Sequence, residues 1–283
     1  MILTADDTRH DEDHAALIAA CEPGVALCTI VGIDGSFSRR LGAQLAIRSD
    51  GSVVGSLADG CLERQLASDV RRIEGPKVVR YGAGSQMIDF RLPCGGGLDI
   101  LLDPAPDRTQ ARRAVKLLKR RKAAKLALPE PSPLKCRAYT PRLFVKVFGE
   151  GPELDAFFRL GNAAGVAVEP FEKDQLTLGQ SSGEGAGDRW TAILLLFHDH
   201  EWELPLLAEA LEGHAFYIGA QGGENARHNR TLALLQAGCD EKELARIVSP
   251  VGLLPGCKSP ANLALSALTE IVGRYETLRE RTV

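Results

Sequence analysis

Apolar residues recur along the chain in two patterns, one typical of strands and the other typical of helices. In the first third of the sequence, three stretches combine β-branched and apolar residues as strands do: 25–33, 77–81 and 98–102. Residues 61–72 instead repeat Leu62, Leu66 and Val70 at helical spacing. Glycines concentrate between these segments, so this region is expected to form a small α/β domain.

From residue 143 onward, short apolar strands alternate regularly with helices. Strands are expected at 143–148, 166–168, 190–197 and 216–218. The last helix has a well-marked start, because Ser259 is a suitable N-cap and Pro260 suits the first helical position. Such alternation builds a parallel sheet with helices on both faces. The predicted fold class is therefore α/β, with a C-terminal Rossmann-like doubly wound parallel sheet preceded by a smaller α/β N-terminal domain.

These patterns divide the chain into an N-terminal domain at residues 1–105, a basic connector and hairpin at 106–141, and the Rossmann-like domain at 142–283. Between residues 108 and 125 the connector is rich in arginine and lysine, with a partial helical stripe of apolar residues. A helix of this kind either presents a solvated face or grips RNA or a phosphate group. The solvated face is the more common outcome for such runs.

Composition narrows the classes of function. The chain has 283 residues, a net charge of −3 and a sequence pI of about 6.1, so nothing attracts it as a whole to nucleic acid or to an anionic membrane. Apolar runs such as residues 191–197 are too short to span a bilayer. The N-terminus is polar and acidic, so export is not expected and the predicted location is cytoplasmic. Seven cysteines without a CxxC pair predict reduced thiols, rather than disulfides or a cysteine zinc site.

Three glycine-rich loops in the first region have the composition of an anion-binding site. They span residues 35–42, 55–63 and 93–97. Glycine leaves backbone amides free to face an anion, arginine pairs with phosphate, and serine hydroxyls add donors. The alternative is that these are ordinary turns with small residues. The candidate cofactor-binding residues on these loops are Ser36, Arg39, Arg40, Gly60, Cys61, Cys94 and Gly95.

Cys61 stands at the expected start of a helix. The amides and the dipole at a helix start should lower the pKa of its thiol and favour the thiolate. Arg39 and Arg40 add positive charge if the loops converge, whereas the carboxylate of Asp59 acts in the opposite direction. The alternative is that Cys61 is a small buried apolar residue.

The C-terminal region places further candidates at strand ends, where ligands bind in doubly wound sheets. Gly149 and Gly151 form a strand-to-helix turn that resembles a phosphate-binding turn, although Leu154 stands in place of the third glycine; the alternative is a simple tight turn. His198 and His200 could share a metal ion if His214 or His228 converged on them, but no third ligand is evident, so polar contacts to a ligand are expected here and no metal site is predicted. No nucleophile motif is present either, and no catalytic residue is assigned. The candidate cofactor-binding residues here are Gly149, Gly151, His198, Gly219 and Gly222.

Taken in order, these motifs resemble those of the XdhC/CoxI family of xanthine dehydrogenase accessory proteins. The matching segments are 35–43, 55–63, 94–96, 149–154, 198–201, 217–223 and 250–271, so the resemblance covers nearly the whole chain. The C-terminal segment is the most specific of them. The sequence departs from the family pattern at Ser38, where proline is usual, at Asp59, where glycine is usual, and at Gly223, where serine is usual.

The resemblance implies a maturation chaperone rather than an enzyme. It implies binding of the molybdenum cofactor (molybdopterin), support for its sulfuration together with a cysteine desulfurase, and delivery to a xanthine-dehydrogenase-type molybdoenzyme. It also implies a homodimer. The Rossmann turn, taken by itself, adds a nucleotide as a further candidate ligand. Two alternatives come from the residues alone: a nicotinamide-dependent oxidoreductase and a nucleotide-sensing regulatory module.

Overall fold

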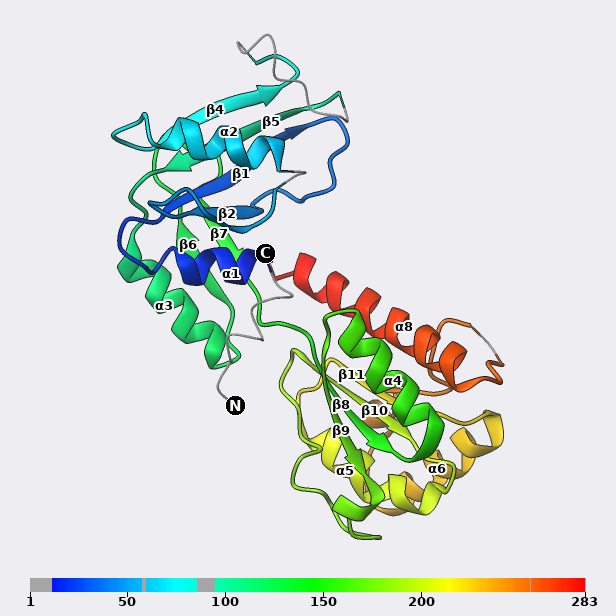
Figure 1. The fold of residues 1–283 in the computed structure, drawn as a ribbon. Coiled ribbons are helices and arrows are strands. Elements are labelled where there is room, and N and C mark those ends of the chain that lie inside the picture. Colours follow the sequence, from blue (N-terminus) through cyan, green and yellow to red (C-terminus); the bar gives the residue numbers. More distant parts are fainter. Residues whose placement is uncertain (1–11, 58–59, 86–94, 255, 283) are drawn as a thin grey trace. The chain divides into compact units, whose positions relative to one another are not determined.

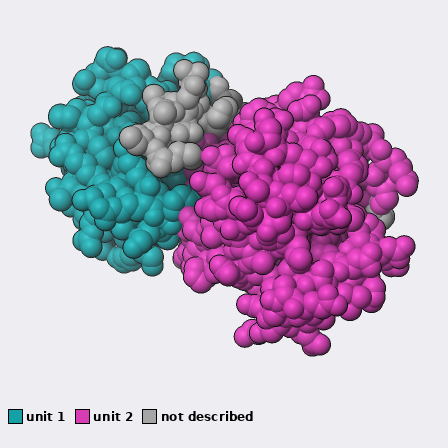
Figure 2. Space-filling view, turned by 90° about the horizontal axis from the view of Figure 1, so that it is seen from below, with its two compact units in different colours: residues 1–141 teal, residues 142–283 magenta. Residues whose placement is uncertain are grey.

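The computed structural model describes residues 12–57, 60–85, 95–254 and 256–282. The chain forms two compact units, Met1–Pro141 (unit 1) and Arg142–Val283 (unit 2), coloured separately in Figure 2. Each unit has its own sheet and its own hydrophobic clusters. Within the described residues, no helix is long and apolar enough to cross a membrane.

Unit 1 is built on a five-stranded antiparallel sheet with the order β3-β2-β1-β5-β4. The strands are β1 (Ala26–Asp34), β2 (Gln44–Ile47), β3 (Val53–Gly55), β4 (Lys77–Gly82) and β5 (Gly97–Asp103). Successive residues of the central strand β1 point to opposite faces of the sheet, as the period of two requires. Cys28 and Ile30 belong to the hydrophobic cluster on one face of the sheet, while Leu27 belongs to the cluster on the other face.

Helices cover both faces of this sheet (Figure 1). α2 (Cys61–Val70) buries Leu62, Leu66 and Val70 against one face, as its periodicity predicts. α1 (Glu12–Ala19) and α3 (Arg108–Lys119) cover the other face together with the hairpin of β6 (Ala124–Ala127) and β7 (Cys136–Tyr139). Residues 106–141 therefore pack as part of unit 1.

Unit 2 contains a five-stranded parallel sheet with the order β12-β11-β10-β8-β9. Its strands are β8 (Phe144–Gly149), β9 (Ala167–Glu172), β10 (Thr191–Leu196), β11 (Tyr217–Ala220) and β12 (Ile247–Val248). The chain goes from β8 outward to β9 and then returns past β8 to β10. The direction of winding thus reverses between β8 and β10, which is the point where doubly wound sheets bind ligands.

Helices on both faces complete the doubly wound architecture and confirm the predicted fold class. α4 (Gly151–Ala163) and α8 (Pro260–Glu280) pack on one face of the sheet, and α5 (Glu203–Glu212) and α6 (Glu224–Gln236) on the other. A short helix, α7 (Glu241–Leu244), and two 3₁₀ turns, η1 (Lys173–Gln175) and η2 (His200–Trp202), lie in the connections.

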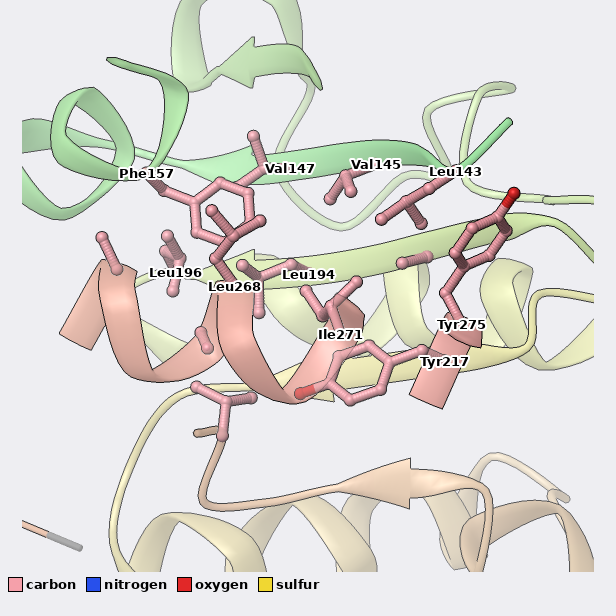
Figure 3. Packing of buried hydrophobic residues seen from close by; sticks show 14 of the residues in the cluster. Leu143, Val145, Val147, Phe157, Leu194, Leu196, Tyr217, Leu268, Ile271 and Tyr275 are labelled. Atoms are coloured by element: carbon pink, nitrogen blue, oxygen red, sulfur yellow. The ribbon is translucent and has the colours of Figure 1, made fainter. Parts of the chain in front are cut away.

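The start of α8 is confirmed as the sequence predicts, because the Ser259 hydroxyl accepts a hydrogen bond from the Asn262 amide at 3.1 Å. Its apolar rows fill the space over the sheet. Figure 3 shows Leu268 and Ile271 against Leu194, Leu196 and other side chains of the strands.

Candidate functional site

The three glycine-rich loops of unit 1 meet at one edge of its sheet. The Arg39 guanidinium of the first loop donates to the Ser56 hydroxyl of the second across 3.2 Å. A Cβ on Gly35 of the first loop would lie 3.5 Å from Cα of Gly96 in the third. This follows from the antiparallel pairing, which places the end of β1 beside the start of β5. The loops therefore converge, as an anion site built from all three requires.

An open pocket of about 770 Å³ lies between the β2–β3 turn and α2. The second glycine loop bounds this pocket on one side, and the exposed side of α2 bounds it on the other. Arg64, Arg71 and Arg72 line it together with several serines, which gives it both cations and neutral donors. The residues around it are Asp50, Gly51, Ser52, Val53, Gly55, Ser56, Gly60, Glu63, Arg64, Ala67, Ser68, Arg71 and Arg72.

Two carboxylates in the pocket wall are held by hydrogen bonds from the backbone. Glu63 is 6% exposed and accepts from the Leu57 amide at 2.9 Å and from the Gly60 amide at 2.7 Å. Asp50 accepts from the Ser52 amide at 2.8 Å, and hydrogen bonds from the Ser52 hydroxyl and amide lower the pKa of Asp50. These hydrogen bonds fix both carboxylates in the pocket wall, where their negative charges lie beside the positive charges of the arginines.

Glu63 fixes the entry into α2 and was not among the predicted site residues. Gly60, the N-cap residue, has a positive φ of 91°, which favours glycine, and the Glu63 carboxylate accepts from the Gly60 amide as the acidic residue of a capping box does. The signal was available in the sequence, because an acidic residue three positions after an N-cap is the usual mark of such a box. The two hydrogen bonds to Glu63 hold the Leu57 and Gly60 amides against the first turn of the helix.

Cys61 is the first residue of α2, as predicted, and its side chain is exposed. Arg64 Nη2 lies 3.2 Å from its Sγ atom. Cys28 is the opposite case, since it is fully buried in β1 and burial raises the pKa of its thiol. Among the described cysteines, Cys61 is therefore the exposed one and follows the pocket residue Gly60, and the alternative of a buried apolar role for Cys61 is wrong.

Of the described candidates on these three loops, Gly60 lines the pocket, whereas Ser36, Arg39, Arg40, Cys61 and Gly95 are not among its lining residues. Ser36 and Arg40 are exposed on the first loop, and Gly95 has a positive φ of 70° at the start of the described part of the third. Cys94 and Asp59 lie outside the described residues.

In unit 2, three predicted residues come together where the winding of the sheet reverses. Gly149 permits the close approach of β8 to β10, because a Cβ there would lie 2.8 Å from the Leu196 carbonyl oxygen. Gly151 has a φ of 71°, and a Cβ added to it would meet no atom within 4 Å. His198 Nε2 lies 3.3 Å from Glu153 Oε2, joining the end of β10 to the first turn of α4.

This edge carries more negative charge than a phosphate site needs. Glu153 sits in the first turn of α4, where its carboxylate already interacts favourably with the positive end of the helix dipole. Glu150 precedes it and pairs with Lys173 at 2.6 Å. A phosphate at this turn therefore meets the negative charge of Glu153, whereas the pocket of unit 1 has three arginines beside its two carboxylates.

The second glycine loop of unit 2 is anchored by a buried ion pair that the sequence did not reveal. Arg230 donates to Glu203 Oε2 through Nε at 2.9 Å and Nη2 at 2.7 Å, and to the Gln221 carbonyl at 2.8 Å. His200 Nδ1 lies 3.1 Å from the same oxygen of Glu203. Burial raises the pKa of Glu203, and the charge of Arg230 opposes this.

The glycines of that loop have different roles. Gly219 lies inside β11, where a Cβ would come within 2.5 Å of the Tyr217 ring and 2.8 Å of Val251, so its small size serves packing. Gly222 has a φ of 116°, and a Cβ on it would lie 3.3 Å from the His200 ring. Among the described residues, no cluster of His, Cys, Asp and Glu could hold a metal ion.

The C-terminal motif is tied to α8 through two polar side chains. Glu270 Oε2 accepts from the Gly252 amide at 2.8 Å and from the Tyr217 hydroxyl at 2.9 Å. The Ser266 hydroxyl accepts from the Leu254 amide at 2.7 Å. This segment therefore stabilises the fold of unit 2.

Comparison with known proteins gives two matches to protein families. The family described as "XdhC and CoxI family" matches residues 19–82, and that described as "XdhC Rossmann domain" matches residues 145–271. The molybdenum cofactor insertion chaperone PaoD of Escherichia coli (strain K12) is 31% identical over 267 residues, which cover 88% of this chain and 82% of PaoD. Among solved structures, a xanthine dehydrogenase from Bacillus halodurans superimposes with a TM-score of 0.68 at 20% identity, covering 94% of this chain and 96% of that chain. At that identity the likeness concerns the fold alone.

Proposed function

This chain belongs to the XdhC and CoxI family, and on that basis we propose that it binds the molybdenum cofactor and inserts it into a molybdoenzyme. The observation that carries the proposal is the arginine-lined pocket beside the second glycine loop of unit 1, where Arg39 of the first loop donates to Ser56. The cofactor is a pterin with a phosphate group, and arginine guanidinium groups and glycine-loop amides are the donors that phosphate prefers. Arg64 and Arg71 are the residues we assign to the phosphate.

The proposal extends to sulfuration of the bound cofactor and to a client of the xanthine-dehydrogenase type. Cys61 is exposed and lies between Gly60 and Arg64, which both line the pocket. A soft sulfur ligand suits the molybdenum–dithiolene end of the cofactor, so we assign Cys61 to that end. A cysteine desulfurase would supply sulfur to the cofactor held there, and the protein would act as a cytoplasmic homodimer.

The turn between β8 and α4 is the candidate position for a nucleotide. The open space at Gly151 favours such a ligand, and the carboxylate of Glu153 opposes it. A nicotinamide-dependent oxidoreductase is the weaker candidate, because Leu154 stands where the third glycine of a dinucleotide turn belongs and is buried in the core.

The function is tested by maturation of a client enzyme. In cells that make the cofactor but lack this protein, a xanthine-dehydrogenase-type enzyme should be produced as protein yet remain largely inactive. Supplying the wild-type chain should restore activity and the molybdenum content of the client. Full client activity in the absence of the chain would overturn the proposal.

A further inference from the structure

Residues 108–125 carry a dense run of positive charge on a chain whose net charge is −3. The segment contains no acidic residue. Its basic residues are Arg108, Arg112, Arg113, Lys116, Lys119, Arg120, Arg121, Lys122 and Lys125.

The structure shows that this charge faces solvent while the apolar side of the segment is used up in the core. Ala111, Ala114 and Leu118 of α3 are buried against α1 and the β6–β7 hairpin. The cations that remain exposed are Arg112, Arg113, Lys116, Lys119, Arg120, Lys122 and Lys125.

No ion pair found within the described residues involves any of these exposed cations. Arg112 donates to the Cys21 carbonyl, at 3.2 Å. Two acids near the segment are otherwise engaged, since Glu22 pairs with Arg48 and Asp107 caps the start of α3. Among the side chains that the structure describes, none of these exposed cations is therefore paired with a carboxylate.

A merely solvated helix face does not call for charges of one sign. Arg112, Lys116 and Lys119 follow one another at spacings of four and three residues, where like charges repel, and the helix dipole offsets this in part for Lys116 and Lys119 in the last turn. Alternating signs would keep the face soluble and add attractive pairs instead. A surface that keeps this repulsion is suited to a negatively charged partner.

The chemistry of the segment favours an acidic protein over nucleic acid or a membrane. The segment contains no aromatic side chain for stacking on bases, and its one amide side chain, Gln110, is bonded to Asp107 and to the Ala127 backbone. A membrane-bound helix would expose its apolar side to lipid, but that side is buried here.

We propose that the exposed cations of α3 and the turn after it form the docking surface for an acidic patch on the client molybdoenzyme. This rests on the proposed function, because it takes the client to be the macromolecule that the chain must meet. Opposite charges on two proteins act chiefly by steering their encounter. The surface is separate from the arginines of the pocket, so docking and cofactor retention can be lost independently.

The test compares two variants with the same net charge. One carries Arg113→Glu, Lys116→Glu and Arg120→Glu on α3. The control carries Arg159→Glu, Lys242→Glu and Lys258→Glu, which are exposed residues of unit 2. Association with the purified apo form of the xanthine-dehydrogenase-type client is followed by stopped-flow fluorescence at several salt concentrations, and the pterin content of each chaperone is measured in parallel.

The α3 variant should contain as much pterin as the wild type but associate with the client at least about tenfold more slowly at low salt. The control should associate like the wild type, and raising the salt should bring all three proteins toward one rate. Equal rates for the α3 variant and the control at low salt would overturn the docking surface. The docking surface would also be overturned if the wild type bound a DNA duplex and the α3 variant did not, while both associated with the client at the same rate. A wild type without pterin would instead refute the proposed function.

Discussion

The guanidinium of Arg39 and the hydroxyl of Ser56 lie 3.2 Å apart and join two glycine-rich loops. The first loop leaves β1 and the second leads into α2, so the contact holds the segment before the helix against the edge of the sheet. The pocket assigned to the cofactor lies beside this contact, and Ser56 is part of its lining.

Alkylation should distinguish Cys61 from Cys28. Cys61 is exposed, while Cys28 is fully buried and its thiol has a raised pKa. N-ethylmaleimide applied to the native protein should therefore modify Cys61 and leave Cys28 unmodified until the chain is unfolded, as read by peptide mass spectrometry. Protection of Cys61 in the native, ligand-free protein would refute its placement.

Cys61→Ser should fold normally but retain less cofactor and yield less active client. The hydroxyl keeps the size of the thiol and removes the soft sulfur that suits molybdenum. Client activity is to be measured at limiting amounts of the chaperone, with Cys257→Ser of unit 2 as the matched control. Full activation by Cys61→Ser under these conditions would remove the residue from the site.

Glu63→Gln should destabilise unit 1. The carboxylate accepts from two backbone amides, and an amide side chain offers only one acceptor oxygen, which leaves a buried donor without a partner. The expected loss in the free energy of unfolding is about 1–3 kcal/mol. Urea denaturation measures it, and Glu130→Gln, at an exposed ion pair with Lys135, should change stability far less. Equal effects of the two substitutions would contradict the role given to Glu63.

Asp103→Asn should stabilise the protein increasingly as the pH rises from 3 to 7. Burial raises the pKa of Asp103 above the ordinary value of 3.8, so the native state holds the proton more tightly than the unfolded state. The free energy of unfolding is then greatest below the unfolded pKa and falls as the pH rises through the native pKa. Asparagine avoids this loss and still accepts from the Ala105 amide, as Asp103 does at 3.1 Å.

Asp107 provides the opposite case for the same titration. Hydrogen bonds from the backbone and the side chain of Gln110 lower the pKa of Asp107. The ionised carboxylate therefore stabilises the fold at pH values above the ordinary pKa of aspartate, and this stabilisation is lost as the pH falls through the native pKa. The melting temperature of Asp107→Asn should therefore lie below that of the wild type at neutral pH and approach it in acid. Parallel pH profiles for the Asp103 and Asp107 variants would show that burial does not set the sign at Asp103.

The turn of unit 2 can be tested without disturbing the sheet. Asparagine tolerates the left-handed backbone of Gly151 and places a side chain in the open space there. Gly151→Asn should therefore fold normally and abolish any rise in melting temperature that adenine or nicotinamide nucleotides cause in the wild type. Gly149→Ala should instead lower the free energy of unfolding by about 1–3 kcal/mol, because the added Cβ meets the Leu196 carbonyl oxygen. An unchanged nucleotide response in Gly151→Asn would make the turn purely structural.

The fold was readable from the sequence because its signals are local. Strand alternation, the cap at Ser259 and the helical spacing of Leu62, Leu66 and Val70 each lie within a few residues. The convergence of the glycine loops was foreseen only through their shared composition. The pair of Glu203 and Arg230, 27 residues apart, leaves no local pattern, since either residue alone is typical of a solvated helix.

The site is subject to the same limit. Arg64, Arg71 and Arg72 read as ordinary polar positions of an amphipathic helix, and only the fold of β2 and β3 beside α2 turns them into one wall of a pocket. Gly219 shows the converse, because its place in a glycine-rich loop suggested ligand contact while its neighbours show a requirement of packing.

The central claim, that unit 1 holds the cofactor, is tested most directly by the pterin and molybdenum content of protein purified from cells with intact cofactor synthesis. Arg64→Gln with Arg71→Gln neutralises two exposed cations of the pocket, and Arg113→Gln with Arg120→Gln neutralises two on α3 of the same unit. We predict that the pocket variant loses most of its pterin and molybdenum, while the α3 variant and Gly151→Asn keep wild-type amounts. Wild-type content in the pocket variant, with loss in Gly151→Asn, would contradict the account and place the cofactor in unit 2.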